Sequence, residues 1–334
     1  MRTRKIKIDG LPRAAPNELG AKAYGRALKQ YVRLLKKALP RLTVGIVTAL
    51  PREADAVRSK LESCEPLYRI DDFHTYYLGD VRSRLSNSVI HQVAVVKCID
   101  MGNSSASTAT TALMNTFPAI RHVIMCGIAG GVPSPKNPDD HVRLGDVVVS
   151  DKRGVVEYDQ IKDSSGRLEY RNADPKPSAE LIRAASMVRD THYEWHLLIP
   201  LADFGGKKRL RPSDGTDLLY VDRKGTRTIE HPRQHQRVVD RPLLHFGNIG
   251  SANILLKNTK RRELLRLKFA LKAVEMEGSG VAKAAWSMGR GYLIVRGICD
   301  YANEHKNGKW QPYAAEAAAA FTQSVIAHLI DERT

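Results

Sequence analysis

Short apolar runs alternate with longer amphipathic segments along this chain, a pattern that favours strands followed by helices. The clearest example is residues 274–303, where small apolar residues recur at helical spacing and a continuous apolar run, Tyr292–Ile298, follows. Gly289 and Gly291 separate the two segments, as expected for a break between elements. This stretch therefore predicts one helix and one buried strand.

Two carboxylates flank this predicted helix and strand. Glu277 lies at the start of the helix, where a negative charge suits the helix dipole, and Asp300 lies just past the carboxyl end of the strand. In an open α/β sheet that strand end is where ligands bind. The two acids are therefore a candidate pair for proton transfer and for binding a sugar hydroxyl. The alternative is a helix-terminal acid and a turn aspartate without a shared role.

The same reasoning predicts an α/β order over the rest of the chain. The expected elements are a strand, turn and helix over Leu42–Glu62, hairpin strands Thr75–Leu78 and Val89–Ile99, a helix over Ser104–Asn115, a strand over His122–Cys126, a turn and edge strand over Arg143–Asp151, a helix near Ser178–Asp190, regular pattern again over Leu243–Leu256 and Lys260–Ala270, and a closing alanine-rich helix over Pro312–Ile330. Residues 160–241 are polar and rich in proline, glycine and charge, which predicts an insertion over or beside the crevice.

Two further segments carry candidate chemistry at predicted strand ends. Glu53 falls in the first turn of the helix after the first strand, and from there it can point into the crevice. A surface acid that complements the helix dipole is the alternative. The run GIAGGVPS supplies Gly127 and Gly130, which let the backbone approach a ligand closely, although plain tight turns use the same residues.

The chain of 334 residues has a net charge of +17, and its distribution suggests an anionic partner. Residues 1–41 hold twelve Lys or Arg against two acids and form a basic arm with a predicted amphipathic helix from about Asn17 to Leu39. This helix is expected to dock on its own domain, 42–334, or on a partner chain, with nucleic-acid or membrane binding the less favoured alternative. A second basic cluster lies within 207–241. Nucleic acid, an acidic surface and a phosphorylated small molecule all remain compatible with this charge.

Composition excludes several classes of protein. No apolar run reaches the roughly 20 residues that span a bilayer, and the start lacks the apolar core of a signal peptide, so a cytoplasmic location without membrane contact is expected. The four cysteines are scattered without the spacing of metal ligands, and they are expected to be reduced thiols. The sequence therefore predicts neither a metal site nor a cofactor.

Six motifs in order, VGIVTALPREADA, GIAGGVPS, RLGDVVVSD, GSANILLKN, VEMEGSG and VRGICDYAN, resemble the nucleoside phosphorylase/nucleosidase superfamily. The resemblance covers roughly residues 42–330, interrupted by 160–241, and is closest in plan to the 5'-methylthioadenosine/S-adenosylhomocysteine nucleosidases. The closing run is similar to the phosphorylase-like domains of fungal NLR-like proteins and bacterial antiphage systems, some of which resemble ATP nucleosidases. The resemblance implies a three-layer α/β/α fold around a twisted, barrel-like mixed sheet, a homo-oligomer, and cleavage of a purine N-glycosidic bond.

The resemblance also implies a role for individual residues. Glu53 would activate the attacking water, Arg296 would help hold that water or its base, and Asp300 would protonate purine N7. Glu277 would bind the ribose hydroxyls with Met276 beneath the sugar. The substrate-binding set implied in full is Glu277, Met276, Gly127, Ile128, Gly130, Leu255, Trp310 and Tyr313.

Three departures from the family pattern bear on the chemistry. Met125 and Ile128 stand where family phosphorylases carry an Arg and a Ser for phosphate, which favours water as the nucleophile. Leu255 stands where a base-stacking Phe is usual, so Trp310 is expected to contribute more to base binding. We therefore expect a hydrolase that releases adenine from an adenine nucleotide, with ATP favoured and a defence role implied by the resemblance. The alternatives are a thioether nucleosidase and a non-catalytic nucleotide-sensing module.

Overall fold

The computed structural model describes residues 42–69, 72–165, 167–171, 175–191, 193–199, 211–222 and 224–330. Contacts divide the chain into two units, Met1–Arg41 and Leu42–Thr334. The helix expected over Asn17–Leu39 lies outside the described residues, and so do the first three basic residues of the 207–241 cluster. No helix within the described ranges is long and apolar enough to cross a membrane.

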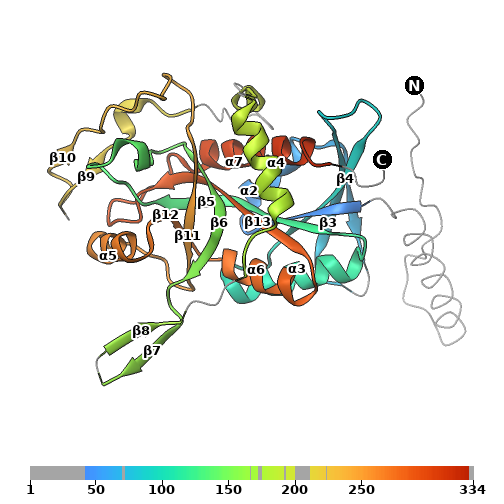
Figure 1. The fold of residues 1–334 in the computed structure, drawn as a ribbon, viewed down its shortest axis with the longest axis horizontal. Helices are drawn as coiled ribbons and strands as arrows, with labels where there is room; N and C mark the ends of the chain where they lie inside the picture. Colours follow the sequence, from blue (N-terminus) through green and yellow to red (C-terminus); the bar gives the residue numbers. More distant parts are fainter. Residues whose placement is uncertain are drawn as a thin grey trace, which may run out of the picture. The chain divides into compact units, whose positions relative to one another are not determined.

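A nine-stranded mixed sheet forms the centre of the second unit (Figure 1). In spatial order its strands are β12 (Leu271–Glu275), β11 (Leu244–Ser251), β6 (Val147–Glu157), β13 (Gly291–Asp300), β5 (His122–Gly131), β1 (Leu42–Thr48), β4 (Ile90–Lys97), β3 (Thr75–Arg82) and β2 (Glu62–Tyr68). β12 also pairs antiparallel with β5, which closes the strands from β12 to β5 into a barrel. The predicted α/β fold with a barrel-like mixed sheet is confirmed.

Helices cover both faces of this sheet (Figure 1). On one side lie α2 (Pro51–Arg58), α4 (Ala179–Asp190) and α7 (Gln311–Ala327); on the other lie α3 (Asn103–Thr116) and α6 (Gly278–Ser287), while α5 (Thr259–Phe269) packs on β12. The alanines of α7 allow its backbone to approach β13 directly, since a Cβ built on Gly297 would lie 1.9 Å from the Ala314 carbonyl oxygen. Small residues at this contact therefore set the distance between helix and sheet.

The segment expected as an insertion contains α4 and short irregular elements. They are two small hairpins, β7 (Ile161–Ser164) with β8 (Arg167–Tyr170) and β9 (Leu219–Tyr220) with β10 (Thr228–Ile229), and the single-turn helices Trp195–Leu198 and Asp214–Thr216; a third such turn, Pro138–Asp140, precedes β6. Asp146 joins this segment to the sheet. Its buried carboxylate accepts hydrogen bonds from Arg237 Nη1 and Nη2 at 3.0 and 2.7 Å and from His245 Nε2 at 3.0 Å. These contacts hold the pKa of Asp146 well below its usual value although burial opposes them.

Three expectations from the pattern need correction. β6 is an interior strand between β11 and β13, so the prediction of an edge-like strand was wrong. β5 does not stop at Cys126 but runs through the glycines to Gly131, paired with β13 and β12. β2 was not expected, because it is mostly exposed at the end of the sheet and contains Pro66, so it lacks the alternation that marks a half-buried strand.

Candidate active site

Arg296 lies at the centre of a buried cluster of acids. It occupies the middle of β13, its side chain is fully buried, and its Nη2 donates to Glu275 and, at 3.2 Å, to Glu277 Oε2. Its Nη1 lies 3.4 Å from the Ile128 carbonyl oxygen. Burial alone would lower the pKa of Arg296, but Glu275, Glu277 and Glu53 together raise it. The guanidinium is therefore permanently charged and holds acids from separate elements in one place.

Glu53 reaches this cluster from the first turn of α2. Its Oε2 accepts hydrogen bonds from the Ala49 and Leu50 amides at 2.8 Å each, and its Oε1 accepts one from the Ile128 amide, also at 2.8 Å. Burial raises the pKa of Glu53, whereas the Arg296 charge and the backbone donors oppose that rise. Glu53 is thus not a surface acid. Its carboxylate joins the end of β1 to the glycine-rich end of β5.

Glu277 is the N-cap residue of α6, as its pattern predicted. Its Oε1 accepts from the Gly102 amide at 3.1 Å and its Oε2 contacts Arg296, so it lies between the start of α3 and β13. Burial raises the pKa of Glu277 to about 7, Arg296 opposes this, and the charges of Glu275 and Glu53 add to it. A carboxyl group of this kind changes its charge near neutral pH.

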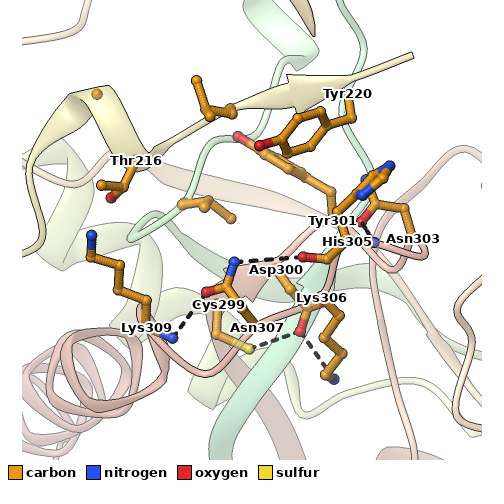
Figure 2. Close-up of a pocket in the computed structure, with 13 residues that line it drawn as sticks. Thr216, Tyr220, Cys299, Asp300, Tyr301, Asn303, His305, Lys306, Asn307 and Lys309 are labelled. Carbon is orange, nitrogen blue, oxygen red and sulfur yellow. Dashed lines mark hydrogen bonds and ion pairs between the residues drawn. The ribbon is translucent and has the colours of Figure 1, made fainter. Parts of the chain in front are cut away.

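Asp300 is the last residue of β13 and lines a cavity of about 240 Å³ (Figure 2). Its Oδ1 accepts from the Ala302 amide at 2.8 Å, and its Oδ2 lies 3.1 Å from Cys299 Sγ and 3.0 Å from Lys306 Nζ. The wall of the cavity combines the loop after β13 with the turn before β9; its lining residues are Leu144, Gly215, Thr216, Leu218, Tyr220, Cys299, Asp300, Tyr301, Asn303, His305, Lys306, Asn307 and Lys309. Residues 215–220, within the segment 160–241, therefore contribute to the wall of the cavity that Asp300 also lines.

Glycines in β5 allow these side chains to lie against the backbone. A Cβ on Gly127 would lie 2.4 Å from Arg296 Nη1 and 2.6 Å from Glu53 Oε1. A Cβ on Gly130, which pairs with Asp300 in the sheet, would lie 3.0 Å from Asp300 Oδ1. Both positions therefore require glycine for close approach, although the segment is a strand and not a turn.

The structure brings some of the predicted site residues together and separates others. Glu53, Arg296 and Glu277 form one cluster, with Gly127 and Ile128 in contact with it. Asp300 and Gly130 lie farther along the paired strands β13 and β5. Of the acids expected to act on substrate, Asp300 is the one among the residues that line the cavity.

The residues expected to bind the base and sugar differ in burial and in location. Met276 is half-buried between Glu275 and Glu277, whereas Leu255 is 51% exposed in the loop after β11. Trp310 and Tyr313 are buried together, edge to face, against Gly145. Neither aromatic residue is among the described residues that line the cavity. Their expected contact with a base stays a prediction.

The sequence profile of the Phosphorylase superfamily matches residues 43–330 of the chain. The chain belongs to this superfamily. Among curated relatives of this superfamily member, an NLR-like protein from Hyaloscypha variabilis is 29% identical over 85% of the chain and 29% of its own length. The ATP nucleosidase Cap17 from Escherichia coli is 27% identical over 86% of the chain and 51% of its own length. The chain thus spans 29% of the length of the first relative and about half of the length of the second.

Smaller enzymes match over nearly their whole length. The 5'-methylthioadenosine/S-adenosylhomocysteine nucleosidase of Mycobacterium bovis is 23% identical, over 85% of the chain and 96% of its own length. The solved structure of the corresponding enzyme from Neisseria meningitidis, in complex with methylthio-immucillin-A, superposes with a TM-score of 0.58 at 18% identity and covers 86% of the chain and 99% of its own. Futalosine hydrolase of Helicobacter pylori gives a TM-score of 0.58 at 19% identity, over 86% of the chain and 99% of its own. These structures share the fold of the chain.

Two residues of the candidate site in this superfamily member were not identified from the sequence. Glu275 binds Arg296 and accepts hydrogen bonds from the Glu277 and Gly278 amides at the start of α6. It lies two residues before Glu277 in the VEME motif, and a second acid so close to a predicted site acid was a signal that could have been used. Lys306 pairs with Asp300 from a loop, where spacing carries no such signal. Within the described ranges, no group of three or more His, Cys, Asp or Glu is arranged to hold a metal ion.

Proposed function

We propose that this chain is a purine nucleosidase that hydrolyses the N-glycosidic bond of an adenine nucleotide, with ATP as the favoured substrate. The observation that carries the proposal is the arrangement of buried acids along β5. Glu53 and Glu277 are fixed by backbone amides and Arg296, and Asp300 stands beyond them at the cavity. Glycosidic bonds break through an oxocarbenium-like state, which a nearby carboxylate stabilises and leaving-group protonation assists.

The proposed reaction assigns each acid one step. Water adds to the sugar C1' and gives a proton to Glu53, whose pKa is raised by burial so that it is a stronger base than an exposed glutamate. The bonding electrons leave with the purine, which takes up a proton on the Asp300 side of the cavity. Glu277 accepts hydrogen bonds from the ribose hydroxyls. The products are adenine and a ribose that keeps its 5' phosphates.

Water is the proposed nucleophile because the positions expected to bind phosphate are apolar. Met125 is fully buried within β5, and Ile128 offers its amide to Glu53 and no side-chain donor. Neither supplies the positive charge or hydroxyl that a phosphate ion requires. Hydrolysis is therefore favoured over phosphorolysis.

A nucleotide is favoured over a neutral nucleoside by two observations. Lys306 and Lys309 line the cavity, where positive charge suits an anionic substrate. The relative Cap17 is named as an ATP nucleosidase. A role as a defence effector rests on the resemblance of the closing run alone, and a homo-oligomeric state and cytoplasmic location stay predictions.

The decisive experiment offers the purified protein ATP, 5'-methylthioadenosine and S-adenosylhomocysteine separately and measures free adenine by chromatography. We expect adenine chiefly from ATP, and its loss in a Glu53→Gln variant. Adenine from the two thioethers alone would reject the nucleotide preference and select the thioether nucleosidase that the smaller relatives exemplify. Binding of ATP without release of adenine would select a nucleotide-sensing module. Ile128 favours this alternative, because its side chain has no hydroxyl that could help hold the attacking water.

A further inference from the structure

Two histidines in contact join the insertion to the loop that precedes β6. His141 is fully buried in that loop, and its Nε2 lies 2.8 Å from Nδ1 of His231, which follows β10. The other ring nitrogen of His231, Nε2, lies 2.9 Å from the carbonyl oxygen of Asp217. Thr216 and Leu218, on either side of Asp217, line the cavity. The histidine pair therefore connects the sheet side of the molecule to a wall of the cavity.

The donors around the pair fix which ring nitrogens carry protons. The Ser134 amide donates to His141 Nδ1 at 3.2 Å, so this nitrogen is the unprotonated one. Neutral His141 then carries its proton on Nε2 and donates to His231 Nδ1. Since that nitrogen accepts, His231 carries its proton on Nε2 and donates to the Asp217 carbonyl oxygen. The contacts form one directed chain in which every donor meets an acceptor.

An additional proton has no acceptor within this chain. On His231 Nδ1 it would face the Nε2–H of His141, and on His141 Nδ1 it would face the Ser134 amide. Reversing the chain does not help, because neutral His141 would then carry its proton on the nitrogen that faces the Ser134 amide. In each case two donors meet where burial excludes water, which is costly. The docked pair is therefore restricted to its neutral form.

The charged surroundings of the pair act in both directions. The titratable and charged groups near it are Arg143, Asp146, Asp217, Arg237 and Tyr301. Burial lowers the pKa of His141 from 6.5 to about 4, and the charges of His231 and Arg143 add to this effect. The Asp146 and Asp217 carboxylates oppose it, but each is itself paired with an arginine. Burial and the cations therefore outweigh the acids at His141.

We propose that His141 and His231 form an acid-sensitive latch, which holds residues 211–231 beside the cavity while both rings are neutral and releases them when the pair takes up a proton. Above the ordinary histidine pKa of 6.5 the pair is neutral whether docked or released, and the latch has its full strength. As the pH falls below 6.5 the released pair binds protons first, whereas docked His141 does so only near its pKa of about 4. Docking therefore weakens across this range, and the cavity loses the wall that carries Thr216 and Leu218.

Amide hydrogen exchange of a peptide that covers Thr216 and Asp217 measures this release. Their amides donate to the Ser213 and Asp214 carbonyls within the docked segment. After correction for intrinsic exchange, we expect the opening equilibrium of this peptide to rise about 30-fold from about pH 7.5 to about pH 5, the effect of excluding one proton from the docked state. A peptide from α5 is the internal reference for global unfolding and should change less than about threefold. No substrate is needed, so the result is independent of adenine release.

His141→Gln separates the proton from the hydrogen bonds. Glutamine keeps an acceptor for the Ser134 amide and a donor for His231 but cannot take up a proton, so this variant should stay docked and lose most of the rise. His235→Gln changes an exposed histidine of the same insertion and should keep the full rise. An equal rise in the wild type and in His141→Gln, or no rise in the wild type, would overturn the latch.

The ring nitrogens of His141 provide a second measurement on the wild-type protein. If His141→Gln releases the segment already at about pH 7.5, the nitrogen chemical shifts of wild-type His141 decide the question. A neutral ring with its proton on Nε2 at about pH 7.5 and about pH 5 upholds the latch. A proton on Nδ1, or a charged ring in the docked protein at about pH 5, contradicts it.

Discussion

The raised pKa of Glu277 predicts that removing this buried charge stabilises the fold, whereas removing a buried charge usually destabilises a protein. Burial raises this pKa to about 7 from an ordinary value of 4.5, against the opposing effect of Arg296. Below the ordinary value both folded and unfolded chains carry the proton, so ionisation costs the fold nothing. As the pH rises toward 7 the unfolded chain ionises first, and the folded state loses relative stability. Above pH 7 the full loss is roughly 3 kcal/mol.

Glu277→Gln keeps the shape of the protonated acid and cannot ionise, so it should escape this loss. We expect its unfolding free energy, measured with urea, to gain about 3 kcal/mol relative to the wild type between about pH 5 and about pH 8. The same variant should release adenine poorly, because an uncharged amide replaces the carboxylate proposed to bind the ribose hydroxyls. Glu65→Gln, an exposed position on β2, is the control and should show no pH-dependent difference. An equal stability difference at both pH values would refute the reasoning.

Three further variants test other contacts. Arg296→Met leaves buried acids without their cation and should lower the unfolding free energy by about 3–5 kcal/mol in urea titrations. Gly127→Ala places a Cβ against Glu53 and should cost about 100-fold in adenine release, whereas Gly308→Ala, with no atom closer than 3.8 Å, should be neutral in the same assay. The buried Asp217 accepts hydrogen bonds at 2.6 Å from the hydroxyl of Tyr301, which lines the cavity, and at 2.8 Å from Arg143. Asp217→Asn weakens these contacts and should raise KM about tenfold, seen in initial rates, with kcat less affected.

Strong local patterns predicted most of the fold. The helix start at Glu277, the hairpin of β3 and β4 and the helix α4 each follow from spacing within a few residues. The position of β6 did not, because its place between β11 and β13 depends on pairings with residues about 100 and 150 positions away. The path of β5 through its glycines was also missed. Glycine usually signals a turn, and here it makes room for Arg296 and Glu53 within a strand.

The candidate site was predictable where chemistry and element ends coincide. Glu53, Glu277 and Asp300 each lie at a helix start or strand end, which the pattern locates. Lys306 lies in an irregular loop, so its pairing with Asp300 depends on the folded path of that loop and not on spacing. Trp310 also makes a contact that the sequence did not suggest. Its indole N–H donates to Thr216 at 3.1 Å, so the ring is used to anchor the insertion to the start of α7.

The insertion's basic residues show why charge count alone overstates the positive charge available to a ligand. Arg237 is committed to the buried Asp146, and Arg211 pairs with Asp214 and Asp240. These guanidinium groups hold the insertion in place, so a polyphosphate would have to break internal ion pairs to use them. Lys309 is exposed, lines the cavity and forms no ion pair among the contacts described. We therefore infer that Lys309, in the loop after β13, is available to an anionic substrate, whereas Arg211 and Arg237 are held in internal ion pairs.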